Sequence, residues 1–491
     1  MLFNSYSFLA FFPIVCILYF ALPHRFRKVM LLVASYYFYM GWNAKYALIL
    51  WFSTTITYLA GLGVDHFKDN PKKKKLILIL SLVSNLGILA FFKYFGFIIH
   101  NINRVLGAFG ASDITNPFAY LLLPVGISFY IFQALGYSID VYRGDLPVEK
   151  DYLKYALFVS FFPQLVAGPI ERSKNLLNQF DEVHTFDYRR MCDGLLEMTW
   201  GFFIKLVVAD RLAIFVDFVY NSPEVEGRFY LLASVLFAFQ IYCDFAGYST
   251  IAIGCARIMG FTLMENFNAP YLSQSVAEFW RRWHISLSTW FRDYLYIPLG
   301  GNRKGKARKW LNLMIVFGVS GLWHGADYTY VIWGLLNGGF QVIGEWISPF
   351  KKKIEAFCVN GPSKAILRVV RTVITFALID FAWIFFRAGS LDQANQVLFS
   401  ILHMEGGFHF GDTATFMLGF SKYDFILVGI SLVVMLFTDI CRYNGVVIRE
   451  RILNTAFPLR WFICIFAVLF IMLFGIWGSG YNQTQFIYFQ F

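Results

Sequence analysis

Apolar runs long enough to cross a membrane follow one another along nearly the whole chain. A helix needs about 20 mostly apolar residues to cross the hydrocarbon of a bilayer. The pattern therefore predicts an all-α polytopic membrane protein with about eleven transmembrane helices, accompanied by re-entrant or interfacial helices. The candidate spans are 6–22, 29–41, 46–63, 76–100, 118–139, 152–168, 194–220, 229–258, 311–327, 330–348, 366–387, 421–441 and 459–478.

Some of these runs are interrupted. Lys205, Asp210 and Arg211 break the run at 194–220, and a Gly-Pro pair ends the run at 152–168. Broken helices at membrane depth are tolerated where they line a cavity. We therefore expect one or two re-entrant pieces among the candidate spans.

The longest non-apolar stretch, residues 265–309, mixes charged and aromatic side chains. Aromatic rings favour the membrane interface, where one edge stays wet. This mixture predicts an interfacial or re-entrant segment and not a full span.

Composition agrees with the membrane assignment. Hydrophobic residues make up 58% of the 491 residues and charged residues only 15%, whereas soluble domains carry roughly 25% charged residues. The apolar runs extend from end to end, so we expect a single membrane domain over residues 1–491. The run at 6–22 has no basic segment before it and no small-residue cleavage site after it, which favours a retained helix over a signal peptide.

The net charge of +11 comes from short basic clusters between apolar runs. Such clusters favour the cytoplasmic side of a membrane, beside anionic lipid, over a nucleic-acid partner. Placing all of them there predicts that both termini are extracytoplasmic. An even number of the three candidate segments between 142 and 302 must then cross, so one of them, with 152–168 the first candidate, is re-entrant. The clusters lie at 25–28, 72–75, 303–309, 351–353 and 442–451.

Several classes of site have no support in the sequence. There is no phosphate-binding glycine loop, no dinucleotide fingerprint and no zinc-protease helix. The seven cysteines are scattered and form no C-x-x-C pair, so we expect no metal site and no disulfide framework.

His324 is the first candidate for chemistry. It lies about fourteen residues into a helix predicted to begin near Trp310, which places it roughly 20 Å deep. An ionisable group at that depth suggests function, and the flanking Gly321 and Gly325 allow another group to approach closely. A neutral imidazole can take a proton from a hydroxyl or thiol. A structural histidine bonded across helices is an equally good interpretation of position alone.

His284 follows a pair of arginines, Arg281 and Arg282, forty residues before His324. The planar guanidinium fork suits phosphate binding. An interfacial helix whose arginines meet lipid headgroups explains the same residues, and without further support that interpretation is the better one.

Asp244, with Tyr248 one turn later, is a charge inside an otherwise apolar run. Such a carboxylate faces a cavity and pairs with a cation or a histidine. It can orient a catalytic histidine or form a structural ion pair, of which the ion pair is the simpler. Asp380 and Arg387 enclose an aromatic stretch that predicts a helix end with interfacial anchors.

Several motifs together resemble the membrane-bound O-acyltransferase (MBOAT) family. The strongest are the block from Glu278 to Gly301, the segment Glu265-Asn-Phe-Asn-Ala-Pro before it, and Gly321-Leu-Trp-His-Gly325. Within the family the chain resembles the bacterial branch that contains the membrane subunit of alginate O-acetylation. Further matches are Leu123-Pro-Val-Gly-Ile-Ser-Phe-Tyr130, Asp140-Val-Tyr-Arg-Gly144, Phe162-Pro-Gln-Leu-Val-Ala-Gly-Pro169, Asp244-Phe-Ala-Gly-Tyr-Ser249 and Phe385-Phe-Arg-Ala388.

The resemblance implies a ring of tilted helices around a central tunnel, with the family core at about 118–387. It implies that His324 is the catalytic base and that His284 occupies the second family position, toward the donor side. Arg281, Arg282 and Trp283 become candidates for donor binding. Tyr248, Asp244, Trp323 and Asn312 remain candidates for orienting or tunnel residues, and Ser320 is a further candidate for stabilising the oxyanion.

The resemblance also implies the substrates and partners. The acyl donor is a thioester, acetyl-CoA in the polysaccharide branch, which is a substrate, so no resident cofactor is expected. The acceptor is an extracytoplasmic polysaccharide, reached with a separate transferase or esterase-like protein outside a bacterial cytoplasmic membrane. D-alanyl transfer to teichoic acid, by the related branch, is the first alternative. A non-enzymatic transporter is the second, and it leaves the 278–301 block unexplained.

Overall fold

The computed structural model describes residues 1–119, 121–222, 225–358, 360–404 and 420–477. Within these residues every regular element is a helix. Six of the described helices are long and apolar enough to cross a membrane, namely those at Ala44–His66, Pro71–Ala108, Gly227–Met259, Gly361–Arg387, Lys422–Tyr443 and Phe457–Phe474. The predicted all-α polytopic membrane fold is confirmed. The larger number of spans and the orientation of the N-terminus stay predictions, and the C-terminus lies outside the described residues.

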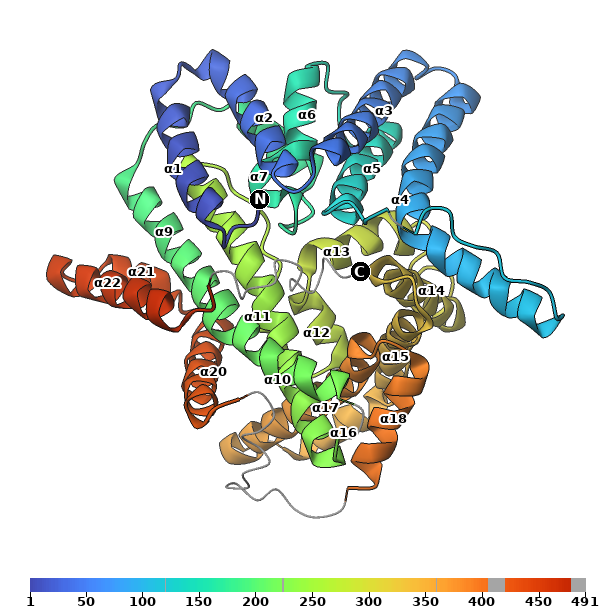
Figure 1. Cartoon of the computed structure of the whole chain (residues 1–491), viewed down its shortest axis with the longest axis vertical. Coiled ribbons are helices and arrows are strands. Elements are labelled where there is room, and N and C mark those ends of the chain that lie inside the picture. The colour runs from blue at the N-terminus through green and yellow to red at the C-terminus, as the bar shows by residue number, and fades with distance from the viewer. Residues whose placement is uncertain (120, 223–224, 359, 405–419, 478–491) are drawn as a thin grey trace. The chain divides into compact units, whose positions relative to one another are not determined.

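Two compact units divide the described chain (Figure 1). Unit 1 contains Met1–Met198 and Ser249–Met264, and unit 2 contains Thr199–Tyr248 and most of the chain from Glu265 onward. The single membrane domain expected over residues 1–491 stays a prediction.

Unit 1 begins with long helices and continues with short ones. Its elements are α1 (Tyr6–Ala21), α2 (His24–Met40), η1 (Ala44–Tyr46), α3 (Ala47–His66), α4 (Pro71–Ala108), α5 (Ile127–Arg143), α6 (Tyr152–Ser160), α7 (Phe162–Leu165), α8 (Ser173–Leu176), η2 (Asn178–Asp181), and the larger part of α9 (Tyr188–Phe202).

Small and polar side chains hold α3, α4, α5 and α6 together, as expected for helices packed in a membrane. The Ser53 hydroxyl donates to Asn85 Oδ1 at 2.5 Å between α3 and α4. Tyr155 on α6 donates to Thr57 Oγ1 at 2.8 Å. A Cβ on Gly61 would lie 2.8 Å from the ring of Tyr137, so α3 and α5 approach closely at this glycine.

Two predicted spans of this unit differ from the observed helices. The run at 118–139 was expected to be helical throughout, but α5 begins only at Ile127 because Pro124 and Gly126, the latter with a φ of 73°, shape a turn before it. The run at 152–168 breaks at Phe161, and α6 has nine residues. A helix of that length rises about 14 Å, too short to cross a bilayer. The re-entrant character of this segment stays a prediction.

Unit 2 carries the remaining long helices and several short ones. Its elements are the π-helix η3 (Phe203–Ala209), α10 (Asp210–Asn221), most of α11 (Gly227–Met259), η4 (Pro270–Leu272), α12 (Val276–Arg282), α13 (Ile285–Phe291), the π-helix η5 (Arg292–Tyr296), α14 (Lys306–His324), α15 (Tyr328–Trp346), α16 (Ser348–Phe357), α17 (Gly361–Arg387), α18 (Leu391–Leu402), α20 (Lys422–Tyr443), α21 (Ile448–Leu453) and α22 (Phe457–Phe474).

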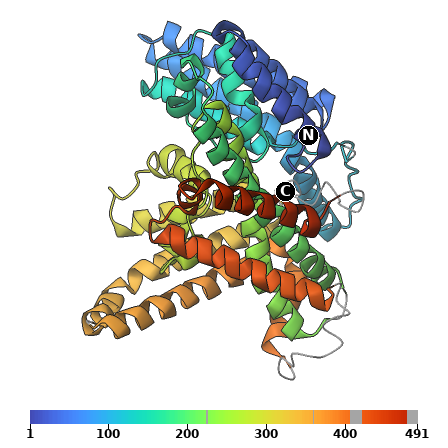
Figure 2. The same ribbon diagram turned by 90° about the vertical axis from the view of Figure 1, so that its left-hand side faces the viewer.

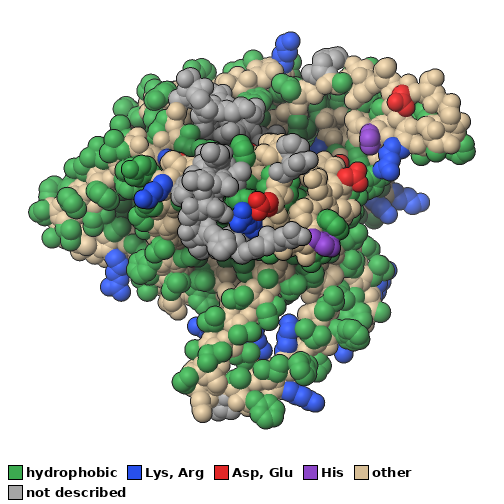
Figure 3. Space-filling view, turned by 60° about the horizontal axis from the view of Figure 1, so that its bottom comes forward, with side chains coloured by type: hydrophobic (Ala, Val, Ile, Leu, Met, Phe, Trp, Pro, Cys, Tyr) green, Lys and Arg blue, Asp and Glu red, His purple; other side chains and the backbone are tan. Residues whose placement is uncertain are grey.

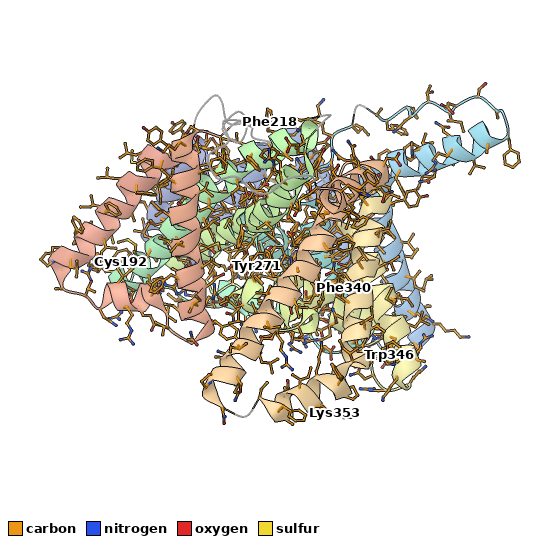
Figure 4. The ribbon with its side chains drawn as sticks, turned by 90° about the horizontal axis from the view of Figure 1, so that it is seen from below. Cys192, Phe218, Tyr271, Phe340, Trp346 and Lys353 are labelled. Carbon is orange, nitrogen blue, oxygen red and sulfur yellow. The ribbon has the colours of Figure 1, made fainter. Side chains whose placement is uncertain are left out.

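Helices α14, α15 and α17 form the support of this unit. α15 packs against both α14 and α17, and Figure 2 shows α15 and α17 as long antiparallel helices joined at one end by α16. The Asp327 carboxylate accepts a hydrogen bond from the Thr329 N–H and so caps the start of α15. Trp346 and Lys353 mark the end of this hairpin that is remote from the α14–α15 turn (Figure 4).

The segment 265–309 folds into the short helices α12, α13 and η5 and contains none of the six long apolar helices. This confirms that the segment is not a full span. The outer surface is largely apolar, as Figure 3 shows for one face, where hydrophobic side chains predominate and Lys and Arg are scattered. Such a surface suits lipid and not water.

Candidate active site

Glycines bring the backbones of α14 and α15 into direct contact. A Cβ on Gly321 would lie 2.2 Å from the carbonyl oxygen of Tyr330, and one on Gly334 would lie 2.2 Å from that of Phe317. Side chains at these positions are incompatible with such distances, so only glycine permits the observed approach. The contact fixes the last turn of α14, which ends at His324.

His324 is buried in a wall of aromatic rings from three elements. Its side chain lies 4.9 Å from Trp323, 4.9 Å from Trp333 on α15 and 5.5 Å from Phe386 on α17, measured between ring centroids. The three rings meet the imidazole edge to face, at interplanar angles of 71° to 86°. These contacts restrict the imidazole to a narrow range of orientations.

His284 lies beside His324. The ring centroids of the two histidines are 6.5 Å apart, and the ring centroid of Phe245 on α11 lies 4.6 Å from that of His284. His284 is fully buried, and this burial lowers the pKa of its imidazole to about 3, so it is neutral at physiological pH. The structure therefore brings together the two histidines that the sequence singled out.

The backbone at His284 is strained. Its φ is 42°, in the left-handed region that non-glycine residues rarely adopt. A neighbouring strap, residues 266–268, holds the turn in place: the Ile285 N–H donates to Asn266 O at 3.0 Å, and the Ser286 hydroxyl donates to Asn266 Oδ1 at 2.6 Å. Strain of this kind gathers at functional sites. Asn266 is thus a positioning residue that the sequence motif contained but did not reveal.

A buried charge network lies beside this centre. Lys205, in the π-helix η3, donates to Asp210 Oδ1 at 2.7 Å and also to Asp244 on α11. All three side chains are buried. Asp244 therefore takes part in an ion pair, as the simpler interpretation held, and it directly precedes Phe245, which contacts His284. Tyr248 lies buried one turn further along α11.

The other predicted site residues lie in different surroundings. Arg281 is exposed, whereas Arg282 pairs with Glu278 at 3.0 Å and lies over the ring of Tyr443. Trp283 is buried among aromatic rings, with Phe267 at 5.0 Å. Their predicted role in donor binding stays a prediction.

Asn312 is buried on α14, where its Nδ2 donates to Gly301 O at 3.1 Å and so holds the preceding loop. It lies twelve residues before His324, which corresponds to about 18 Å along the helix. The structure does not bring these two side chains together, and the tunnel role of Asn312 stays a prediction.

Two contributors to the site were missed from the sequence. The aromatic stretch before Arg387 was expected to anchor a helix end at the membrane interface, yet Trp383 and Phe386 are buried, and Phe386 contacts His324. Trp333 was assigned no role. The one local signal was that it directly precedes Gly334, a glycine at the contact with α14.

The usual ligand sets of metal sites combine His, Cys, Asp and Glu side chains. Among the residues that the structure describes, no three His, Cys, Asp or Glu side chains gather closely enough to hold a metal ion. Independently of this, an imidazole in an aromatic enclosure can accept or donate a proton, and this holds for both buried histidines.

The chain is a membrane O-acyltransferase, and it belongs to the membrane-bound O-acyltransferase family. The sequence profile of that family matches residues 146–358. The chain is 40% identical to the probable alginate O-acetylase of Pseudomonas aeruginosa over 398 residues, which cover 80% of this chain and 73% of that protein. It is 35% identical to the peptidoglycan O-acetyltransferase of Helicobacter pylori, over 83% of this chain and 80% of the relative.

A more distant relative acts in another reaction. The teichoic acid D-alanyltransferase of Bacillus subtilis is 28% identical over 53% of this chain and 68% of its own length. Similarity is thus greater, and extends further, toward the O-acetylating relatives.

Enlarging Gly321 should disturb both the fold and the site. Gly321→Ala forces α14 away from Tyr330, and we expect a loss of about 1–3 kcal/mol in the free energy of unfolding. Gly318→Ala is the matched control, because its Cβ would meet only a side-chain atom of Leu335 at 3.6 Å. Thermal unfolding of the two variants in lipid nanodiscs measures the difference. Equal stability of both variants would contradict the backbone contact.

Replacing Lys205 should remove the buried cation that pairs with two carboxylates. For Lys205→Met we expect a loss of about 3–5 kcal/mol, as for other broken buried pairs. The control is Arg292→Met, which breaks an exposed pair with Asp293 and should cost less than about 1 kcal/mol. Both are measured by thermal unfolding, and an undisturbed Lys205→Met protein would show that the network carries no net stabilisation.

Proposed function

We propose that this O-acyltransferase moves an acetyl group from acetyl-CoA, supplied on the cytoplasmic side, toward a hydroxyl of an extracytoplasmic polysaccharide. The observation that carries the proposal is a pair of buried histidines. His324 ends α14, His284 directly precedes α13, and their ring centroids lie 6.5 Å apart. The acceptor class is supported by the relatives, whose names record acetylation of alginate and of peptidoglycan.

His324 acts as the general base in this proposal. The neutral imidazole accepts the proton of an acceptor hydroxyl while the hydroxyl oxygen attacks the thioester carbonyl carbon. A carbon–oxygen bond forms, the carbon–sulfur bond breaks, and the imidazolium returns the proton to the departing CoA thiolate. The apolar wall of Trp323, Trp333 and Phe386 supports this role, because excluding water suppresses hydrolysis of the thioester.

His284 and the segment after it form the donor side. A neutral His284 places no competing cation beside His324, and its strained turn belongs to the same short helices as the arginine pair. Because Glu278 already neutralises Arg282, Arg281 is the guanidinium better available for the phosphates of CoA.

The cellular setting follows from the basic clusters. We place them on the cytoplasmic side of a bacterial inner membrane, with an extracytoplasmic N-terminus. A separate extracytoplasmic transferase or esterase-like protein completes transfer to the polymer. D-alanyl transfer is the alternative, and the lower identity to the D-alanyltransferase of Bacillus subtilis disfavours it.

Replacing the base tests the proposal directly. His324→Ala should lower acetyl transfer from labelled acetyl-CoA to the polymer by at least about 10²-fold, the contribution of a positioned general base. The assay uses inverted membrane vesicles from cells that make the polymer, and His403→Ala, an exposed histidine, serves as the control. Transfer at the wild-type rate by a folded His324→Ala protein would refute the assignment, and transfer only from a D-alanyl thioester would establish the alternative.

Arg281 offers a separate test of the donor side. Arg281→Gln should raise the KM for acetyl-CoA about tenfold and leave kcat unchanged, because an ionic contact to a remote phosphate stabilises ground state and transition state alike. The control is Arg451→Gln, an exposed arginine on α21. An unchanged KM would remove Arg281 from the donor site.

A further inference from the structure

Trp383 carries a hydrogen-bond donor that the fold does not use. Its side chain is 1% exposed, and among the residues that the structure describes none accepts a hydrogen bond from its Nε1–H. Buried indole N–H groups ordinarily find an acceptor. Trp280 in the same unit follows this rule, because its Nε1 donates to Asn337 Oδ1 at 3.1 Å.

Trp383 packs against residues that adjoin both histidines. Its ring stacks on Trp333, with 5.6 Å between centroids, and lies nearly perpendicular to the ring of Phe386, with 5.2 Å between centroids. Trp333 and Phe386 both contact His324. On another side, Trp383 lies 5.2 Å from Trp283, the residue directly before His284. The indole therefore packs directly against the wall around the reacting centre.

The reaction proposed above needs a donor of this kind. As the hydroxyl oxygen bonds to the thioester carbonyl carbon, the carbonyl π pair moves onto the oxygen and makes it negative. When the pair returns, the carbon–sulfur bond breaks and CoA leaves. A neutral N–H held in an apolar wall stabilises that oxygen strongly, because no water competes and no reorganisation is needed.

We infer that Trp383 is a catalytic residue whose Nε1–H donates a hydrogen bond to the carbonyl oxygen of the acyl donor. The inference rests on the proposed acetyl transfer. It assigns to α17 a direct part in the chemistry, in addition to closing the wall around His324.

The test removes the N–H and keeps an aromatic ring. In the vesicle assay, Trp383→Phe should lower kcat by about a hundredfold, the effect of losing one oxyanion donor, with the KM for acetyl-CoA unchanged. Trp280→Phe is the control for burial and ring size. It should lower thermal stability, because it removes the partner of Asn337, and leave kcat within about twofold.

A spectroscopic measurement separates this role from a structural one. In a His324→Ala background, which prevents turnover, the infrared carbonyl stretch of bound [1-¹³C]acetyl-CoA should move to higher wavenumber when Trp383 is also replaced by Phe. It should stay in place when Trp280 is replaced. If Trp383→Phe does not fold, benzothienylalanine at position 383 keeps both rings and exchanges only the N–H for sulfur.

The outcomes are distinct. A folded Trp383 variant with wild-type kcat, or an unmoved carbonyl stretch, overturns the inference and leaves the proposed function intact. A wild-type protein that neither binds acetyl-CoA nor transfers its acetyl group overturns the proposed function itself, and the inference with it.

Discussion

The contact between the backbones of α14 and α15 is the constraint on which the rest of the site depends. Only glycine at positions 321 and 334 allows two helices to approach so closely. That approach fixes the last turn of α14, and the last residue of α14 is His324. α15 then presents Trp333 to the imidazole, and α17, packed on α15, adds Phe386. A side chain at a helix end would otherwise be loosely held, because helix ends fray.

Charge is kept apart from this apolar centre but remains near it. The buried network joins Lys205 on η3, Asp210 on α10 and Asp244 on α11. Asp244 directly precedes Phe245, whose ring contacts His284. η3 is a π-helix, an irregularity that is frequent at functional sites. The network is costly to desolvate, so its presence suggests that the geometry of α11 matters more here than maximal stability.

Sequence reasoning predicted the helical membrane architecture and singled out the two histidines that the structure brings together, because long apolar runs and intramembrane ionisable groups leave clear local signals. It expected an interfacial role for the aromatic stretch on α17, since local spacing does not distinguish rings that face lipid from rings that face a neighbouring helix. Trp333 and Trp383 belong to that second class, and only the packing of α15 against α17 reveals it. The start of α5 was missed because the apolar pattern continues through Pro124 and Gly126. The backbone preferences of these two residues form a turn, so the helix begins only after them.

The complete burial of both histidines has a kinetic consequence. Neither histidine exposes more than 2% of its surface to solvent, so side chains packed around His324 must move before a substrate can reach it. Rotation of a closely packed indole requires its neighbours to move as well. The frequency of that opening sets an upper limit on turnover, whatever the intrinsic rate of the proton transfer. The packing of the aromatic wall therefore affects the maximum rate of turnover as well as excluding water from the site.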